Sequence, residues 1–269
     1  MLRIGIIGCG TIGAKLAKYI DGNLRNKAKL LALCDIDGKK AYVVANALRS
    51  KPKVKSTRAL INCVDLVIES AAAKISYKIA KQAINVGKDV MVMSTGGLLQ
   101  GFNALFELAE KKRCKIYLPS GALCGLDGLK GAKISAVKKV TLTTKKPPLG
   151  FKGAPYVVKR KIALDKIKSD KVLFEGNALK AIEGFPANIN VAATLSLCGI
   201  GSKKTKVKII ASPRINRNIH EVDVEGEFGK LVTRTENVPS PENPKTSYLA
   251  ILSAIATLNG ILEQVKIGT

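Results

Sequence analysis

The sequence predicts an α/β protein: a doubly wound parallel sheet, followed by a second α+β domain with a mixed or antiparallel sheet. Three observations support this fold class. The chain opens with an apolar strand, a glycine-rich turn and a helix. Strand and helix signals then alternate to about residue 118, and beyond Pro119 several strands follow one another with few helices between them. At 269 residues, the chain is long enough for one large or two modest domains.

The first strand, Leu2–Ile7, runs into Gly8-Cys-Gly-Thr-Ile-Gly13, where a helix extending through Asp21 begins. In a dinucleotide-binding turn, the first glycine permits the tight reversal and the second lets the backbone approach a pyrophosphate. The third lets the helix pack close to the strand. The helix N-terminus favours an anion through its N–H groups and its dipole. The alternative is a turn with a purely structural role. The expected cofactor contacts are Gly8, Gly10, Thr11, Ile12 and Gly13.

The second strand, residues 29–34, ends at Asp35, about twenty residues past the last glycine, where a carboxylate can accept hydrogen bonds from both ribose hydroxyls. Together with the glycine turn, this acidic residue predicts a Rossmann nucleotide site for NAD or NADP. A carboxylate at Asp35 repels a 2′-phosphate and so favours NAD, whereas Lys39 and Lys40 are close enough in sequence to reduce that repulsion. The sequence therefore leaves the choice of cofactor open.

The rest of the first half continues the alternation. The expected helices are 39–48, 76–86 and 102–112, and the expected strands are 64–69, 90–93 and 115–118. Ligands of an open α/β sheet bind outside the carboxyl ends of its strands. Small residues follow three of these ends, in 69–73, 94–97 and 120–124, and leave room for a flat nicotinamide ring, although ordinary turn chemistry explains each segment equally well. Ala71, in the first of these segments, is an expected cofactor contact.

The second half predicts a different organisation. The expected strands are 137–144, 156–161, 206–211, 220–225 and 230–235, and residues 191–197 have helical spacing. Residues 243–264 open with Asn-Pro, which suits a helix cap and first turn, and continue as a long apolar helix. The expected domains are a dinucleotide-binding domain, 1–120, onto which the C-terminal helix of 243–269 packs back, and a substrate, catalytic and dimerisation domain, 121–242.

His220 is the only histidine of the chain. Its side chain has an ordinary pKa near neutrality, so it is the leading candidate for proton transfer at neutral pH. On its expected strand it shares a face with Val222 and Val224, opposite Glu221 and Asp223. A histidine on an apolar face is more often a core residue with its hydrogen bonds satisfied. Packing is therefore the alternative role.

The composition narrows the possible partners, location and metal content of the protein. The net charge is +25, but the lysines are spread over the whole chain and there is no Trp, so nucleic acid is not the expected partner. No apolar run reaches the length of a membrane span, and the N-terminus has no signal-peptide pattern, so a cytoplasmic protein without a membrane partner is expected. The six cysteines have no metal-ligand spacing, which predicts reduced thiols and no metal site.

Four segments resemble one known family: Ser-Gly-Ala-Leu-Cys-Gly-Leu-Asp at 120–127, Gly-Phe-Pro-Ala-Asn-Ile-Asn-Val-Ala-Ala-Thr at 184–194, Asn-Ile-His at 218–220, and Glu-Asn-Pro-Lys-Thr-Ser at 242–247. With the glycine turn, they resemble the L-aspartate dehydrogenases of archaea and some bacteria over essentially the whole chain. The resemblance implies that Ala122 and Asn190 contact the nicotinamide nucleotide and that His220 is catalytic. It gives no account of the lysine excess.

The resemblance further implies NAD(P)-dependent oxidative deamination of L-aspartate. The product, iminoaspartate, either hydrolyses to oxaloacetate and ammonia or supplies the synthesis of quinolinate and then NAD. The substrate carboxylates need cationic or N–H partners, and Lys245 is a candidate. A homodimer is expected.

Three alternatives remain beside this interpretation. A dihydrodipicolinate reductase relative typically needs a His-His pair, which a chain with one histidine cannot supply. A homoserine dehydrogenase relative works through lysine and aspartate, and the match to its signature is weak. A protein that senses nucleotides without catalysis would bind NAD but give no NADH signal with aspartate.

Overall fold

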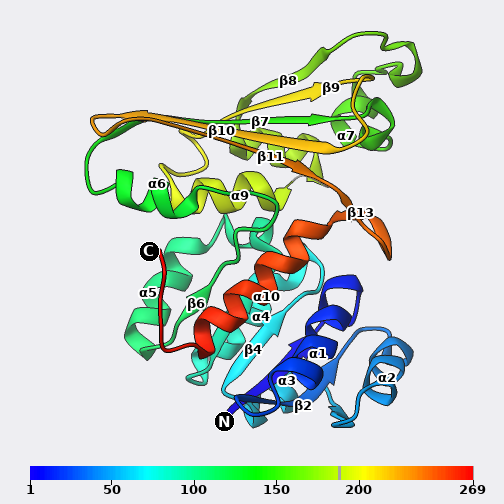
Figure 1. The fold of residues 1–269 in the computed structure, drawn as a ribbon, viewed down its shortest axis with the longest axis vertical. Helices are drawn as coiled ribbons and strands as arrows, with labels where there is room; N and C mark the ends of the chain where they lie inside the picture. Colours follow the sequence, from blue (N-terminus) through cyan, green and yellow to red (C-terminus); the bar gives the residue numbers. More distant parts are fainter. Residues whose placement is uncertain (187–188, 269) are drawn as a thin grey trace. The chain divides into compact units, whose positions relative to one another are not determined.

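The structure is a computed structural model that describes residues 1–186 and 189–268, leaving out the side chains of residues 189, 244 and 245. The chain divides into two compact units (Figure 1). The first unit comprises Met1–Pro119 and Ile251–Val265, and the second comprises Ser120–Ala250 and the residues from Lys266 on. Each unit has its own sheet and its own core.

The first unit is built on a six-stranded sheet of order β3-β2-β1-β4-β5-β6, in which every neighbouring pair is parallel. This confirms the predicted doubly wound parallel sheet. The elements are, in chain order, β1 (Leu2–Ile7), α1 (Thr11–Asn23), β2 (Ala28–Cys34), α2 (Gly38–Ala47), β3 (Lys53–Val54), α3 (Thr57–Cys63), β4 (Leu66–Glu69), α4 (Ala73–Asn85), β5 (Asp89–Val92), the 3-10 helix η1 (Thr95–Leu98), α5 (Phe102–Lys112), β6 (Ile116–Tyr117) and most of α10 (Tyr248–Leu262).

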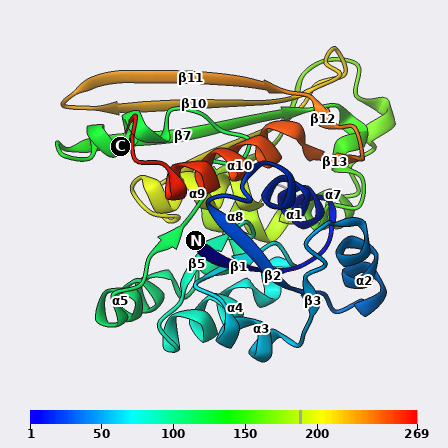
Figure 2. The same cartoon turned by 60° about the horizontal axis from the view of Figure 1, so that its bottom comes forward.

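Helices cover both faces of this sheet (Figure 2). On one face, α1, α2 and α10 pack on alternate residues of the strands, such as Ile4, Ile6 and Ile68. On the other, α3, α4 and α5 pack on the intervening residues, such as Ile7 and Val67. Because parallel strands buried on both faces are apolar throughout, the strand sequences lack a polar side.

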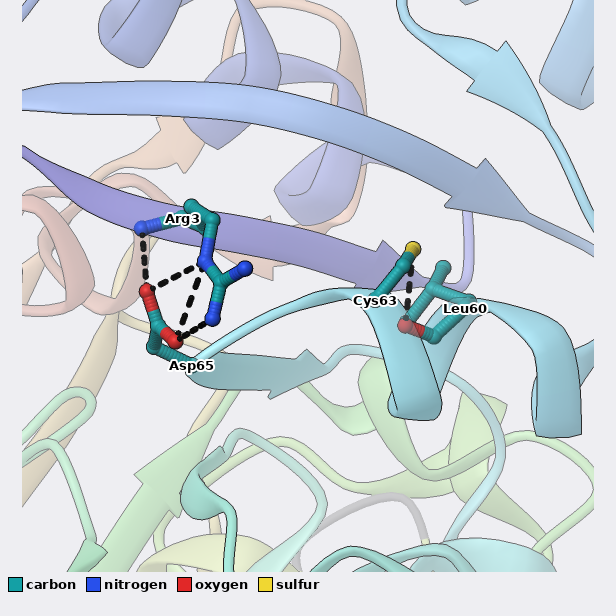
Figure 3. A network of polar contacts seen from close by, with 4 residues as sticks. All are labelled: Arg3, Leu60, Cys63 and Asp65. Carbon is teal, nitrogen blue, oxygen red and sulfur yellow. Dashed lines mark hydrogen bonds and ion pairs between the residues drawn. The ribbon is translucent and has the colours of Figure 1, made fainter.

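Arg3 and Asp65 join β1 and β4 at the end of the sheet opposite the glycine turn (Figure 3). The Arg3 side chain donates to the Asp65 carboxylate from Nε, at 3.0 and 3.1 Å, and from Nη2, at 2.5 Å. The Arg3 backbone N–H donates to the same carboxylate at 3.0 Å. The hydrogen bonds from the Arg3 side chain lower the pKa of Asp65 to about 2. Both side chains are at least a third exposed, so the pair fixes the strand register more than it adds to stability.

The second unit contains a five-stranded mixed sheet of order β11-β10-β7-β9-β8, in which only β7 and β9 run parallel. The mixed sheet was predicted and is confirmed. The elements are α6 (Leu126–Ala132), β7 (Val137–Lys146), η2 (Pro148–Phe151), α7 (Pro155–Lys159), η3 (Leu164–Lys166), β8 (Lys171–Asn177), α8 (Ala178–Gly184), α9 (Ile189–Cys198), β9 (Lys206–Ala211), β10 (Asn218–Gly226), β11 (Gly229–Asn237), β12 (Pro239–Ser240) and β13 (Asn243–Ser247).

One face of the mixed sheet forms the core of the second unit, against α6, α8 and α9 (Figure 1). The other face carries ion pairs, among them Lys139 with Glu225 and Arg234 with Glu221. The alternation predicted for β10 is confirmed, since His220, Val222 and Val224 are all buried. His220 therefore belongs to the face that packs on helices.

The strand predicted at 156–161 is wrong, because this segment forms the helix α7. Pro155 occupies its first turn, where a missing N–H costs nothing, and the Val158 N–H donates to the Ala154 carbonyl. The side chain of Tyr156 packs on Phe174 and Phe185. Tertiary packing of these rings outweighs the local β preference of Tyr and Val.

The prediction that the helix begins at residue 243 is also wrong. Residues Asn243–Ser247 form β13, which pairs with β12 through Pro239 and Ser240, and the helix α10 begins at Tyr248. The Asn-Pro dipeptide thus belongs to a hairpin. The apolar helix itself is as predicted from Tyr248 onward, and Ala254 and Leu258 are buried in the core of the first unit.

Candidate active site

The glycine turn between β1 and α1 has the local geometry of a dinucleotide-binding turn. Gly8 has φ +101°, and a Cβ there would lie 2.5 Å from the Ser70 backbone. A Cβ on Gly13 would lie 1.9 Å from the Gly8 carbonyl oxygen, whereas one on Gly10 would meet nothing within 4 Å. Gly8 and Gly13 are thus required by the turn itself, and Gly10 leaves the N-terminus of α1 open to a ligand. Thr11 and Ile12 belong to the first turn of that helix.

A cavity of about 810 Å³ adjoins this turn and lies entirely on residues of the first unit. Its lining includes four of the predicted cofactor contacts: Gly8, Gly10, Asp35 and Ala71. Asp35 accepts hydrogen bonds from the backbone N–H of Cys9 at 2.6 Å and of Asp37 at 2.9 Å. The carboxylate is therefore held at the mouth of the glycine turn, where a ribose would be bound if a pyrophosphate sat on α1.

Glu69, which the sequence analysis did not single out, organises the loops that follow β4 and β5. Its carboxylate accepts from the backbone N–H of Ala71 at 2.8 Å and of Ser94 at 3.2 Å. The Ser94 hydroxyl donates in turn to the Ala71 carbonyl at 2.6 Å. The residue is fully buried, and this burial raises the pKa of Glu69 to about 7, although the two N–H donors act in the opposite direction. A buried carboxylate thus fixes the backbone at Ala71.

We expect Glu69 to make the stability of the fold depend on pH. Because its folded-state pKa lies above that of an unfolded glutamate, the contribution of Glu69 to stability is fully present below about pH 4.5 and is lost as the pH rises through 7. The loss is on the order of 3 kcal/mol. The Tm of wild type minus the Tm of Glu69→Gln should therefore decrease as the pH rises from 5 to 8. Glu107→Gln, at an exposed position of α5, is the control, and parallel Tm curves for wild type and Glu69→Gln would contradict the prediction.

The remaining predicted contacts belong to the second unit. Ala122 is buried, and its carbonyl accepts from the Thr235 hydroxyl at 2.9 Å and the Asn237 amide at 3.2 Å. Asn190 lies in the first turn of α9 and is exposed. The side chain of Lys245, the predicted substrate residue, is not among those that the structure describes.

His220 lies near the start of β10, directly opposite Thr144 of β7 and Thr235 of β11. It is 4% exposed, and its Nδ1 lies 3.0 Å from the Thr144 hydroxyl. Among the described residues, Nε2 has no hydrogen-bond partner. In the tautomer whose Nδ1–H donates to Thr144, Nε2 carries the lone pair and can accept a proton.

The surroundings of His220 favour the neutral imidazole. Burial, and to a smaller extent the nearby Lys146 ammonium, lower the pKa of His220 to about 3. The Thr235 hydroxyl contacts the carbonyl of His220, at 3.4 Å, and also the carbonyl of Ala122. Thr235 thereby connects His220 to Ala122. The structure therefore brings two predicted site residues of the second unit together through Thr235, which sequence reasoning missed.

The parallel sheet, the glycine turn and the acidic residue after β2 define a dinucleotide-binding protein of the Rossmann class. Residues 8–119 match the model of the homoserine dehydrogenase NAD-binding domain, and residues 127–261 match that of the aspartate dehydrogenase C-terminal domain. The chain belongs to the aspartate dehydrogenase family.

Curated relatives match over the full length. The L-aspartate dehydrogenase of Methanosarcina mazei is 52% identical over 272 residues and that of Nitrosopumilus maritimus is 40% identical over 274, each with complete coverage of both chains. Among solved structures, the aspartate dehydrogenase of Thermotoga maritima aligns over all of both chains with a TM-score of 0.79 and 26% identity.

Two further observations concern membranes and metals. Of the helices in the described part of the chain, none has both the length and the apolar composition needed to cross a bilayer. Within residues 1–186 and 189–268, no three His, Cys, Asp or Glu side chains are grouped so as to hold a metal ion.

Proposed function

We propose that this protein catalyses the NAD(P)-dependent oxidative deamination of L-aspartate. L-Aspartate and the oxidised cofactor give iminoaspartate, the reduced cofactor and a proton, and water converts iminoaspartate to oxaloacetate and ammonia. The observation that carries the proposal is the 52% identity, over the whole chain, to the L-aspartate dehydrogenase of Methanosarcina mazei. The geometry of the glycine turn and the adjoining 810 Å³ cavity support it independently.

The nicotinamide cofactor, when bound, supplies the hydride acceptor. In the first unit, Gly10 leaves the start of α1 accessible to a pyrophosphate, and Asp35 offers carboxylate oxygens to the ribose. Thr11, Ile12 and Ala71 add backbone contacts to the same half of the cofactor, and Ala122 and Asn190 contact its nicotinamide half. These cofactor contacts are all part of the proposal.

His220 moves protons on the substrate. Its neutral imidazole accepts a proton at Nε2, either from the substrate ammonium or from the water that adds to the imine. Thr144 holds the ring in one orientation through Nδ1, at 3.0 Å. The carboxylates of a bound substrate would stabilise the imidazolium, so that the low pKa of His220 in the free protein would rise towards neutrality once the substrate is bound.

An amino-acid panel tests the proposed function. Wild-type protein is assayed for NADH and NADPH absorbance with L-aspartate, L-homoserine, L-alanine and L-glutamate. Turnover with L-aspartate well above that with the others is the expected result. Tight NAD binding without turnover on any of them would instead support a nucleotide-sensing role.

Asp35 should set the cofactor preference. Asp35→Asn is expected to raise the KM for NAD and lower that for NADP, shifting the ratio of their kcat/KM values by roughly tenfold or more, because one charged hydrogen bond and one repulsion are lost together. Asp37→Asn is the matched control: it removes the same charge two residues away and keeps an acceptor for the Lys39 N–H at the start of α2. Equal shifts in both variants would contradict a specific role of Asp35.

The cellular role forms a further part of the proposal. Iminoaspartate that escapes hydrolysis would supply quinolinate and hence NAD synthesis. A cytoplasmic location and a homodimer remain predictions. Light scattering of the purified protein would check the homodimer.

A further inference from the structure

Lys146 is the last residue of β7 and lies on the same face of the mixed sheet as His220. Side chains alternate along a strand, so Lys146 shares a face with Thr144, two residues earlier. Thr144 is the direct cross-strand partner of His220 and contacts its ring. Lys146 is also near enough to His220 for its charge to oppose protonation of the ring. An ammonium group therefore stands beside the candidate catalytic imidazole.

This ammonium has no counter-ion among the described residues. The ion pairs of the sheet lie on its other face, where Lys139 pairs with Glu225 and Lys230 with Asp223. The carboxylate of Asp170 is instead bound by the hydroxyl of Ser212, the residue whose N–H donates to the Lys146 carbonyl. Lys146 is partly buried, and this burial lowers its pKa to about 8. An unpaired cation in such a place costs stability.

We propose that Lys146 binds a carboxylate of the substrate beside His220. The inference rests on the proposed function, which requires a cationic partner for a dicarboxylate substrate. A bound substrate carboxylate would act as the counter-ion that Lys146 does not find among the described residues. It would also reduce the repulsion between the Lys146 ammonium and a protonated His220, so that substrate binding itself prepares the imidazole to accept a proton.

The substitution Lys146→Met tests this assignment, because methionine keeps an unbranched side chain that is one atom shorter and removes the charge. The matched control is Lys145→Met, which makes the same change one residue earlier, on the opposite face of β7. The measurements are the KM for L-aspartate, the Kd of NAD, the Tm, and calorimetric binding of succinate, a dicarboxylate that has no amino group to oxidise.

In Lys146→Met, the KM for L-aspartate and the Kd of succinate should rise by roughly tenfold to a hundredfold, the scale of one charged hydrogen bond. The Kd of NAD should not change, and the Tm should stay equal or rise, because an unpaired buried charge is removed. Lys145→Met should match wild type in all four measurements. Lys146→Arg, which keeps the charge, should recover part of the succinate affinity.

A KM and a succinate Kd within twofold of wild type would overturn the assignment, as would a lowered Tm with unchanged succinate binding, which indicates a structural role. If Lys146→Met does not fold, Lys146→Gln replaces it under the same criteria. Failure of the proposed function looks different: wild-type protein would then give no aspartate-dependent NADH signal, whatever succinate binding shows.

Discussion

The substitution His220→Asn should lower kcat for L-aspartate oxidation by roughly 10²-fold or more, the usual scale for a positioned acid or base. Asparagine is close in size and can still contact the Thr144 hydroxyl, which lies 3.0 Å from Nδ1 in wild type. The fold should therefore persist. The Kd of NAD should change little, because the proposed nucleotide contacts of the glycine turn and Asp35 are untouched. Steady-state kinetics, calorimetry and thermal unfolding measure the three quantities.

Val222→Ala provides the comparison for a purely structural residue. Val222 lies on the same face of β10, two residues from His220, and is also buried. Its truncation should lower the Tm and leave kcat per folded molecule close to wild type. If folded His220→Asn turned over aspartate at a near-wild-type rate, His220 would be a packing residue and the proton-transfer role would be lost.

Replacement of Gly10 by alanine should raise the Kd of NAD by roughly tenfold or more and leave the Tm unchanged. The added Cβ meets nothing within 4 Å in the free protein, so the fold has no reason to respond. A pyrophosphate bound against the backbone at this position would lose its closest approach. Calorimetric titration with NAD, beside thermal unfolding, measures both effects.

Gly13→Ala separates turn geometry from ligand contact. Its Cβ would lie 1.9 Å from the Gly8 carbonyl, so the start of α1 must move away from β1. We expect a lower Tm together with weaker NAD binding, in contrast to Gly10→Ala.

Unchanged NAD affinity in Gly10→Ala would show that the ligand does not approach the backbone at Gly10.

Much of the fold follows from local patterns. Most of the parallel strands and of the helices between them, β3 and α3 excepted, were predictable because the strands are mainly apolar runs bounded by turns. Strand β10 was predictable because buried and partly exposed residues alternate from His220 to Glu225. The error at α7 has a tertiary cause, whereas the error at β13 arises from pairing within a local hairpin. The ring of Tyr156 packs on distant phenylalanines, and β13 exists only because β12 pairs with it.

The candidate site was less accessible to sequence reasoning. His220 is unique and therefore visible, but Lys146 is one of 45 basic residues and nothing local distinguishes it. Its position is exceptional only because β7 pairs with β10 in a register that sets Thr144 against His220. Glu69 carried a weak signal, an acidic residue ending an otherwise apolar strand, which could have been interpreted as a buried carboxylate.

The return of α10 to the first unit has a consequence for biogenesis. The apolar face of β1 and β4 against which Ala254 and Leu258 pack is made before residues 120–250, whereas these two residues of α10 are made after them. During synthesis, that part of the face stays without α10 until residues 120–250 have been made. The first unit is therefore completed only after the second has been made, and a nascent chain stalled before residue 251 would leave the part of the sheet beneath α10 exposed to chaperones.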